Sequence, residues 1–175
     1  DEMKLIGQRI LSIEENEMVV DKFLIDHPEF EILPVNEDVK NNTVDGIEFS
    51  SMEQFMMYQK ACRFHDASVA NEILGTNDVA EIKKLGREVH GYDENTWNGV
   101  RQIVVYEGLK AKFSQNAELK EKLVDTGEAI LAECAVRDQI WGIGLSMRDP
   151  NRLDRSKWKG KNLLGYALMM VREQL

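Results

Sequence analysis

One segment of the sequence combines an apolar surface with a carboxylate and an amine. Glu53 and Lys60 lie in SSMEQFMMYQKACRF, residues 50–64, and helical spacing puts both on one stripe with Met57. A carboxylate in an apolar setting has to be paired or protonated, and that is how proteins make a general acid or base. Ser50 and Glu53 also match the capping-box pattern, so a helix cap is the alternative role of this glutamate.

A second segment, residues 133–152, places a carboxylate and an indole before two glycines. Asp138 and Trp141 precede Gly142 and Gly144 in ECAVRDQIWGIGLSMRDPNR. A tryptophan beside a carboxylate can stack on a flat ring while the carboxylate bonds to the polar edge of that ring. Two glycines one residue apart let the backbone approach a ligand closely or turn sharply. The alternative is a plain turn with a core tryptophan.

Cationic and aromatic residues form a third set of candidates for binding phosphate or a base. Arg and a helix N-terminus are natural phosphate binders, although most exposed Lys and Arg are only solvated. The members are Arg87, then Trp97 and Arg101 one helical turn apart, and Trp158, Lys159, Lys161 and Asn162 in RSKWKGKNLLG.

Composition excludes several classes of protein. The chain has 175 residues and a formal net charge of −9, so it has no overall attraction to nucleic acid, although a local basic cleft remains compatible. Cys62 and Cys134 stand alone and the three histidines are scattered, so we expect no metal, no disulfide and a reducing, cytoplasmic location. No apolar run is long enough to span a membrane.

The elements that would position these residues are mostly helices. The predicted fold class is mainly α with a few short β-strands, in a single domain. Helices are expected over 51–64, from Asp66 or Ser68 to Gly75, over 78–90, from Asp93 to about 113, from Asn116 to Gly127, and over 162–175. Strands are expected at 47–49 and 129–135, and residues 1–45 fit short helices or strands equally well.

Taken together, these blocks resemble the NADAR family, also called YbiA-like. The resemblance covers about residues 45–175 and depends on the order of DGIEFSSMEQFMMYQKA, LGREV, AKFSQNAELKEKLVDTGEAILAECAVRDQIWGIGL and WKGKNLLGYALMMVRE. It implies a compact single-domain YbiA-like fold over 1–175, with a divergent segment at 1–45 and a family-matching core at 46–175.

The resemblance implies an enzyme, an N-glycosidase that cleaves the bond between a ribose carbon and the nitrogen of a base or amine, without a cofactor. Known substrates of the family include phosphoribosylamino-pyrimidine intermediates of riboflavin biosynthesis and ADP-ribose attached to guanine in DNA. The expected partners are therefore a small ribosyl or ADP-ribosyl molecule or an ADP-ribosylated nucleic acid, and no membrane. The alternative from another class is a non-catalytic module that binds ADP-ribose or NAD.

The resemblance also assigns roles. It implies that Glu53 is the carboxylate at the sugar and that Asp138 bonds to the base or is the second acid/base group, and the two roles can be reversed. Trp141 would stack on the base. Lys60 would keep Glu53 ionised and touch a phosphate, which Arg87 would bind. The other substrate-binding residues that it implies are Trp97, Gly142, Gly144 and Asn162, and Gly86, Gly160 and Gly165 match the family's motifs.

Two departures from the family pattern bear on the substrate. Gln54 stands where the family usually has His, which alters one polar contact. Residues 30–44, FEILPVNEDVKNNTV, lack the usual aromatic-Ser-Asn-aromatic-Tyr block that would help to hold sugar and base. Binding energy from remote parts of a substrate positions the reacting centre, so we expect a changed substrate preference rather than a loss of cleavage.

Overall fold

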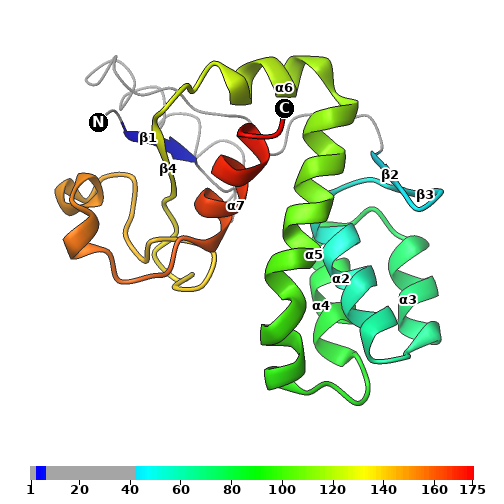
Figure 1. Cartoon of the computed structure of the whole chain (residues 1–175). Coiled ribbons are helices and arrows are strands. Elements are labelled where there is room, and N and C mark those ends of the chain that lie inside the picture. The colour runs from blue at the N-terminus through cyan, green and yellow to red at the C-terminus, as the bar shows by residue number, and fades with distance from the viewer. Residues whose placement is uncertain (1–2, 7–41) are drawn as a thin grey trace. The chain divides into compact units, whose positions relative to one another are not determined.

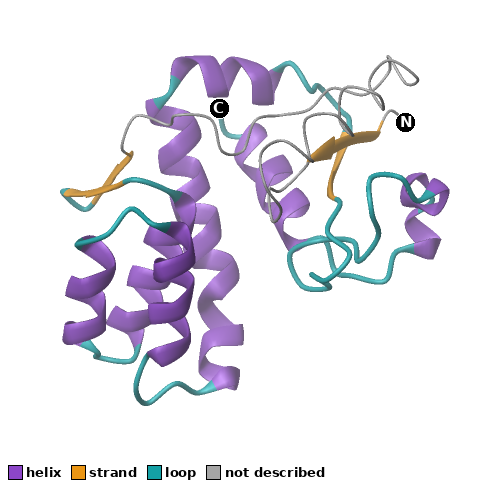
Figure 2. Cartoon of the chain, turned by 180° about the vertical axis from the view of Figure 1, so that it is seen from behind, coloured by secondary structure: helices purple, strands orange, loops and turns teal. Residues whose placement is uncertain are grey.

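The computed structural model describes residues 3–6 and 42–175. Contacts divide the chain into two units, and each is described by itself. The central unit comprises Asp38–Leu119, and the terminal unit comprises Asp1–Glu37 together with Lys120–Leu175. Figure 1 labels their elements and Figure 2 shows the predominance of helix from the other side. The prediction of a mainly α chain with a few short strands is confirmed.

The central unit begins with a hairpin and continues with four helices. Strands β2 (Asn42–Val44) and β3 (Ile47–Phe49) pair antiparallel around a turn at Asp45-Gly46. Asp45 and Gly46 have φ values of 50° and 79°, the left-handed pair that tight hairpins require. The helices are α2 (Met52–Arg63), α3 (Ala67–Leu74), α4 (Val79–Glu88) and α5 (Glu94–Gln115).

A small apolar core joins α2, α3 and α4. Its buried members are Ala61, Val69, Ala70, Ile73, Ile82, Leu85 and Val89. Gly86 of α4 sets the distance to α2, because a Cβ atom there would lie 2.1 Å from Sδ of Met57. The stripe of α2 that carries Glu53, Met57 and Lys60 therefore runs against α4, and this packing decides what Lys60 contacts.

The terminal unit is built around one short strand. Strand β4 (Ile130–Glu133) pairs in parallel with β1 (Met3–Ile6), with Met3 opposite Ile130 and Ile6 opposite Glu133. Helix α7 (Leu163–Arg172) packs against β4. Ala132, Ile143 and Leu145 form a buried apolar cluster, and the partly buried Trp158 packs against it.

Three shorter elements complete the described chain. Helix α6 (Ala117–Val124) ends before Gly127, as the sequence predicted. Gly127 has a φ of 54°. The 3₁₀ turns η1 (Pro150–Leu153) and η2 (Arg155–Lys157) were not predicted, since each is too short to show a helical period. No described helix is both long enough and apolar enough to cross a membrane.

Candidate active site

Glu53 lies in the first turn of α2, but it does not cap that helix. The N-cap is Ser51, whose Oγ accepts a hydrogen bond from the Gln54 N–H at 3.1 Å. Gln54 returns its Oε1 to the Ser50 N–H at 2.7 Å. Ser51 and Gln54 thus cap the helix. The alternative role of Glu53, in a capping box with Ser50, is wrong, because the capping pair lies one residue further along the chain.

The carboxylate of Glu53 is partly buried and forms an ion pair with α4. Its Oε2 lies 3.6 Å from Nζ of Lys83, and its side chain is 21 % exposed. Lys83 was missed in the sequence, because the pair Lys83-Lys84 is typical of a solvated helix face. The helix packed against α2 thus supplies a cation that compensates the charge of Glu53.

Lys60 points to the end of α4 and the loop that follows it. Its Nζ donates a hydrogen bond to the Gly86 carbonyl at 2.5 Å and lies 4.1 Å from the centroid of the Tyr92 ring. Burial lowers the pKa of this amine. Lys83 forms an ion pair with Glu53, and the role of Lys60 in keeping Glu53 ionised stays a prediction.

The other candidates of the central unit differ in exposure. Arg87, in the last turn of α4, is exposed and can be reached by a ligand. Trp97, in the first turn of α5, is only 6 % exposed and belongs to the core of this unit. Arg87 therefore remains a candidate for binding phosphate, because a ligand can reach it. Trp97 could only support a binding surface from within the core, without contacting the ligand itself.

Asp138 shapes the turn that presents Trp141. Its Oδ1 accepts hydrogen bonds from the Ile140 N–H at 2.9 Å and from the Trp141 N–H at 2.8 Å. Both Asp138 and Trp141 are partly exposed. One carboxylate oxygen is thus engaged with the backbone, and it fixes the main chain at Trp141.

The glycines after Trp141 are required by the packing of the backbone. A Cβ atom on Gly142 would lie 2.9 Å from the carbonyl oxygens of both Glu133 and Asp138. Gly144 has a φ of 70° and faces the backbone at Lys159. These contacts agree with the turn interpretation of the two glycines, and close approach of a ligand to them stays a prediction.

Asn162 fastens the end of β4 to the start of α7. Its side chain is fully buried, its Oδ1 accepts from the Glu133 N–H at 3.0 Å, and its Nδ2 donates to the Leu131 carbonyl at 2.8 Å. The residue adopts a left-handed φ of 54°. Gly165 allows the same approach, since a Cβ there would lie 2.2 Å from the Leu131 oxygen. The amide is therefore placed to position β4.

Glu133 is a buried carboxyl group that sequence reasoning did not select. It has no exposed surface, and within residues 3–6 and 42–175 neither carboxyl oxygen has a hydrogen-bond partner. Burial, and secondarily the nearby charge of Asp138, raises its pKa to about 8. The signal that could have found it is a glutamate inside an otherwise apolar strand.

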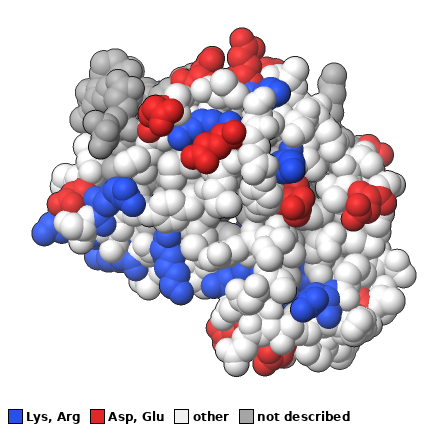
Figure 3. Space-filling model, viewed as in Figure 1, with Lys and Arg blue, Asp and Glu red and all other residues white. Residues whose placement is uncertain are grey.

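Basic side chains gather after this turn in an otherwise acidic protein. Residues 137–161 contain seven Lys and Arg against three Asp, while the chain as a whole has a charge of −9. Two of the three, Asp149 and Asp154, cap η1 and η2. Figure 3 shows Lys and Arg grouped on the part of the terminal unit that carries these turns. This segment could hold an anionic group.

The predicted residues thus fall into two groups. Glu53, Lys60, Gly86, Arg87 and Trp97 lie in the central unit, and Asp138, Trp141, Gly142, Gly144, Gly160, Asn162 and Gly165 lie in the terminal unit. Within the described part of the chain, no cluster of three or more His, Cys, Asp or Glu could hold a metal ion.

Comparison with known proteins decides the family. Residues 23–175 match the model of the NADAR domain. The chain belongs to the NADAR family. The match begins at residue 23, so it includes residues 23–44, which the resemblance based on motifs left out; most of these lie outside the described residues. Most of residues 30–44, the segment that lacks the aromatic block, also lies outside the described residues.

Three relatives illustrate what this NADAR chain is similar to. N-glycosidase R617 of Acanthamoeba polyphaga mimivirus is 38 % identical over 141 residues, which cover 81 % of this chain and 83 % of that protein. N-glycosidase YbiA of Escherichia coli is 34 % identical over 132 residues, covering 75 % and 74 %. Riboflavin biosynthesis protein VVA0006 of Vibrio vulnificus is 32 % identical over 133 residues, covering 76 % of this chain and 32 % of that protein.

The fold agrees with the same family. The NMR structure of E. coli YbiA matches with a TM-score of 0.66 and 27 % identity, over 99 % of this chain and 86 % of that one. The expected YbiA-like fold is confirmed.

Proposed function

We propose that this NADAR chain is an N-glycosidase that hydrolyses the bond between C1 of a ribose and the nitrogen of a base or amine. Its family and the relatives named N-glycosidase in a virus and in a bacterium support this activity. Such a cleavage develops positive charge on the sugar and negative charge on the leaving nitrogen. It therefore needs a carboxylate beside C1 and a source of a proton.

The observation that carries the proposal is the state of Glu53. Because Ser51 and Gln54 cap α2, Glu53 is not needed to start the helix. It is nevertheless kept partly buried on an apolar stripe, and Lys83 compensates its charge at 3.6 Å. A carboxylate held in this way can stabilise a ribosyl cation or activate a water molecule, and this is the role that we assign to it.

The other roles follow from accessibility and hydrogen bonding. Asp138 is the second polar group, which bonds to the base or assists proton transfer, and Trp141 stacks on the base. Oδ1 of Asp138 accepts hydrogen bonds from two backbone N–H groups, and we assign its Oδ2, which shows no hydrogen bond to the described residues, to a ligand. Arg87 and the basic segment 137–161 are candidates for binding phosphate.

Two substrates have separate support. The relative named riboflavin biosynthesis protein favours a phosphoribosylamino-pyrimidine intermediate. The seven cations of residues 137–161 and the departure of residues 30–44 from the family pattern favour a larger anionic substrate such as ADP-ribosylated guanine. A module that binds ADP-ribose or NAD without cleaving it is the alternative, and a partly buried Glu53 argues against it, since binding alone does not need such a group.

A comparison of released products tests the proposal. The protein is incubated in parallel with the riboflavin intermediate and with ADP-ribosyl guanine, and the free base or amine is measured by chromatography. We expect faster release from ADP-ribosyl guanine, because its extra groups compensate for the changed segment. Preference for the riboflavin intermediate would show that this segment does not set the substrate. Binding of ADP-ribose without release from either compound would establish the binding module.

A further inference from the structure

The carboxyl group of Glu133 has no evident structural purpose. It lies at the end of β4, fully buried, and neither of its oxygens accepts a hydrogen bond from the described residues. A buried polar group without partners destabilises a fold, so its presence in native proteins calls for an explanation. Glu133 is also a neighbour of Asp138, the carboxylate that forms the turn before Trp141.

We propose that Glu133 is held as a neutral carboxylic acid and is a positioning residue for Asp138, so that the Asp138–Trp141 turn keeps its shape only while Glu133 carries its proton. This inference rests on the proposed function for its effect on activity. Its effect on the turn is a property of the free protein and can be measured without substrate.

The backbone around Glu133 cannot easily move away from the turn. Its N–H donates to Asn162, and its carbonyl accepts from the Ile143 N–H at 2.8 Å and the Ala135 N–H at 3.2 Å. Gly142 lies directly against the carbonyls of Glu133 and Asp138. A charge placed on the buried Glu133 carboxyl would therefore act on the Asp138 side of the turn, which is partly exposed and can shift.

Among the described residues, the charges that act on the Glu133 carboxyl group do not compensate an ionised form. Within residues 3–6 and 42–175, the charged group that acts on Glu133 is Asp138, which repels a second carboxylate. Beside it lies the Cys134 thiol, whose pKa burial raises to about 12, so that this group stays neutral, and Arg152 of η1 acts on that thiol. Arg172 of α7 is engaged elsewhere, with Thr126 and Ala129. Lys159 and Lys161, on the segment that pairs with the turn, are exposed.

The sign of the pH effect follows from the raised pKa. The ordinary value of 4.5 applies to the unfolded chain and about 8 to the folded one, so the folded state holds a proton that the unfolded state loses between these values. The stabilising effect of the proton is complete below about pH 4.5 and is lost as pH rises through about 8. The turn should therefore lose its shape, and the enzyme its activity, as the pH rises above about 8.

The experiment compares wild type with Glu133→Gln, which has nearly the same shape and no ionisation. Nitrogen-15 NMR of the Trp141 indole reports the turn, and carbon-13 NMR reports the carboxyl groups. In the wild type we expect the chemical shift of the indole to change with pH, with a midpoint at about pH 8, where Glu133 titrates. In Glu133→Gln we expect this chemical shift to remain constant over the same pH range. The control Glu128→Gln, an exposed residue before β4, should behave as wild type.

The rate of base release gives the second readout. Between about pH 7 and about pH 9 the neutral fraction of a group with this pKa falls roughly tenfold, so the wild-type rate should fall by the same factor. In Glu133→Gln the ratio of the two rates should stay within roughly twofold of unity. Asp138→Asn should move the Glu133 midpoint to lower pH by removing the neighbouring charge, yet leave it above 4.5, because burial is the larger cause.

Two results would overturn the inference. A Glu133 carboxyl that ionises near its ordinary value would remove its premise. An alkaline shift of the Trp141 signal that persists in Glu133→Gln would assign the effect to another group. If no substrate is cleaved at all, the proposed function fails, and the NMR titration still decides the inference.

Discussion

Replacing Asn162 separates the role that the sequence predicted from the one its contacts suggest. The resemblance makes Asn162 a substrate-binding residue, whereas its buried amide bonds to the Glu133 N–H and the Leu131 carbonyl. In Asn162→Ala both backbone groups lose their partner inside the protein. Alanine must also adopt the left-handed φ of 54°. We therefore expect a loss of stability rather than a selective loss of ligand affinity.

The size of this loss can be worked out from the two hydrogen bonds and the backbone conformation. Each buried backbone group left unpaired costs about 1–3 kcal/mol. A left-handed alanine adds about 1–2 kcal/mol. The free energy of unfolding should thus fall by about 3–8 kcal/mol, which for a chain of this length lowers the melting temperature by on the order of 10 °C or more. Asn162→Gly, which relieves the backbone, should recover about 1 kcal/mol of that loss.

Urea unfolding followed by circular dichroism measures both variants, and calorimetry with ADP-ribose measures their binding at a temperature where they are folded. The order of stability should be wild type, then Asn162→Gly, then Asn162→Ala. If Asn162→Ala unfolds like wild type and has lost only its affinity for the ligand, the side chain faces the substrate, and the positioning role is refuted.

Two further predictions concern the site directly. Trp141→Ala should weaken binding of a ribonucleotide-like ligand by about 1–3 kcal/mol, the range for stacking of a base on an aromatic ring, with little change in melting temperature. Unchanged affinity together with a large drop in melting temperature would make Trp141 a core residue. Activity should survive treatment with EDTA, since the described residues contain no cluster that could hold a metal. Loss of activity on chelation, restored by one added divalent ion, would contradict this.

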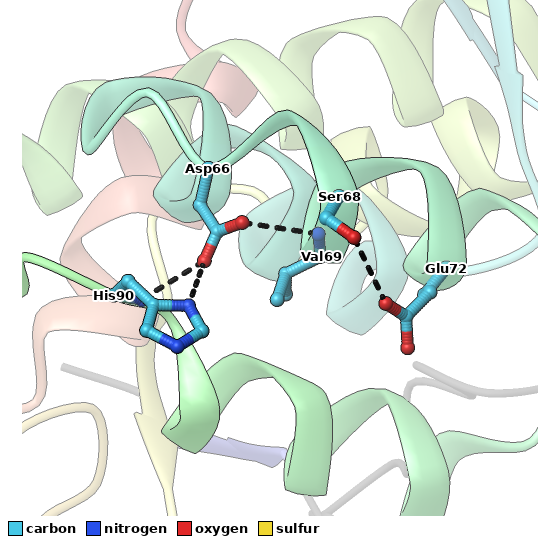
Figure 4. Close-up of polar contacts among 5 residues, drawn as sticks. All are labelled: Asp66, Ser68, Val69, Glu72 and His90. Atoms are coloured by element: carbon cyan, nitrogen blue, oxygen red, sulfur yellow. Dashed lines mark hydrogen bonds and ion pairs between the residues drawn. The ribbon is translucent and has the colours of Figure 1, made fainter.

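The helices could be predicted from the sequence because their start signals are local. Asp66, Asp78 and Asp93 each precede their helix, and each accepts a hydrogen bond from a backbone N–H in the first turn. Asp66 does more than the sequence could show. Its second oxygen accepts the N–H of His90 at 2.9 Å and lies 2.8 Å from Nδ1 of that ring, so that it joins the start of α3 to the end of α4 (Figure 4).

The errors at the candidate site arose where distant parts of the chain decide the outcome. Ser50 and Ser51 are equally good caps in sequence, and Gln54 is fixed by hydrogen bonds from its Nε2 to the carbonyls of Ile73 and Thr76. Lys83, which forms an ion pair with Glu53, lies thirty residues further along the chain. No local pattern contains these contacts.

Strand β4 shows the same limit in another form. Along a strand, Ile130, Ala132 and Cys134 would point to one face and Leu131 and Glu133 to the other. In the structure Leu131, Ala132 and Glu133 are all fully buried, because α7 packs against a strand that also pairs with β1. The position of the strand could be predicted, but the burial of Glu133 depends on elements far away in the sequence.

The central claim is that Glu53 takes part in cleavage of an N-glycosidic bond. The most direct measurement is the rate of base release by wild type, by Glu53→Gln and by the matched control Glu48→Gln, an exposed residue of β3. Glu53→Gln should be slower by roughly 100-fold or more, the range of acid–base catalysis, with its melting temperature preserved. Glu48→Gln should match wild type. A Glu53→Gln variant that releases base as fast as wild type would contradict the account.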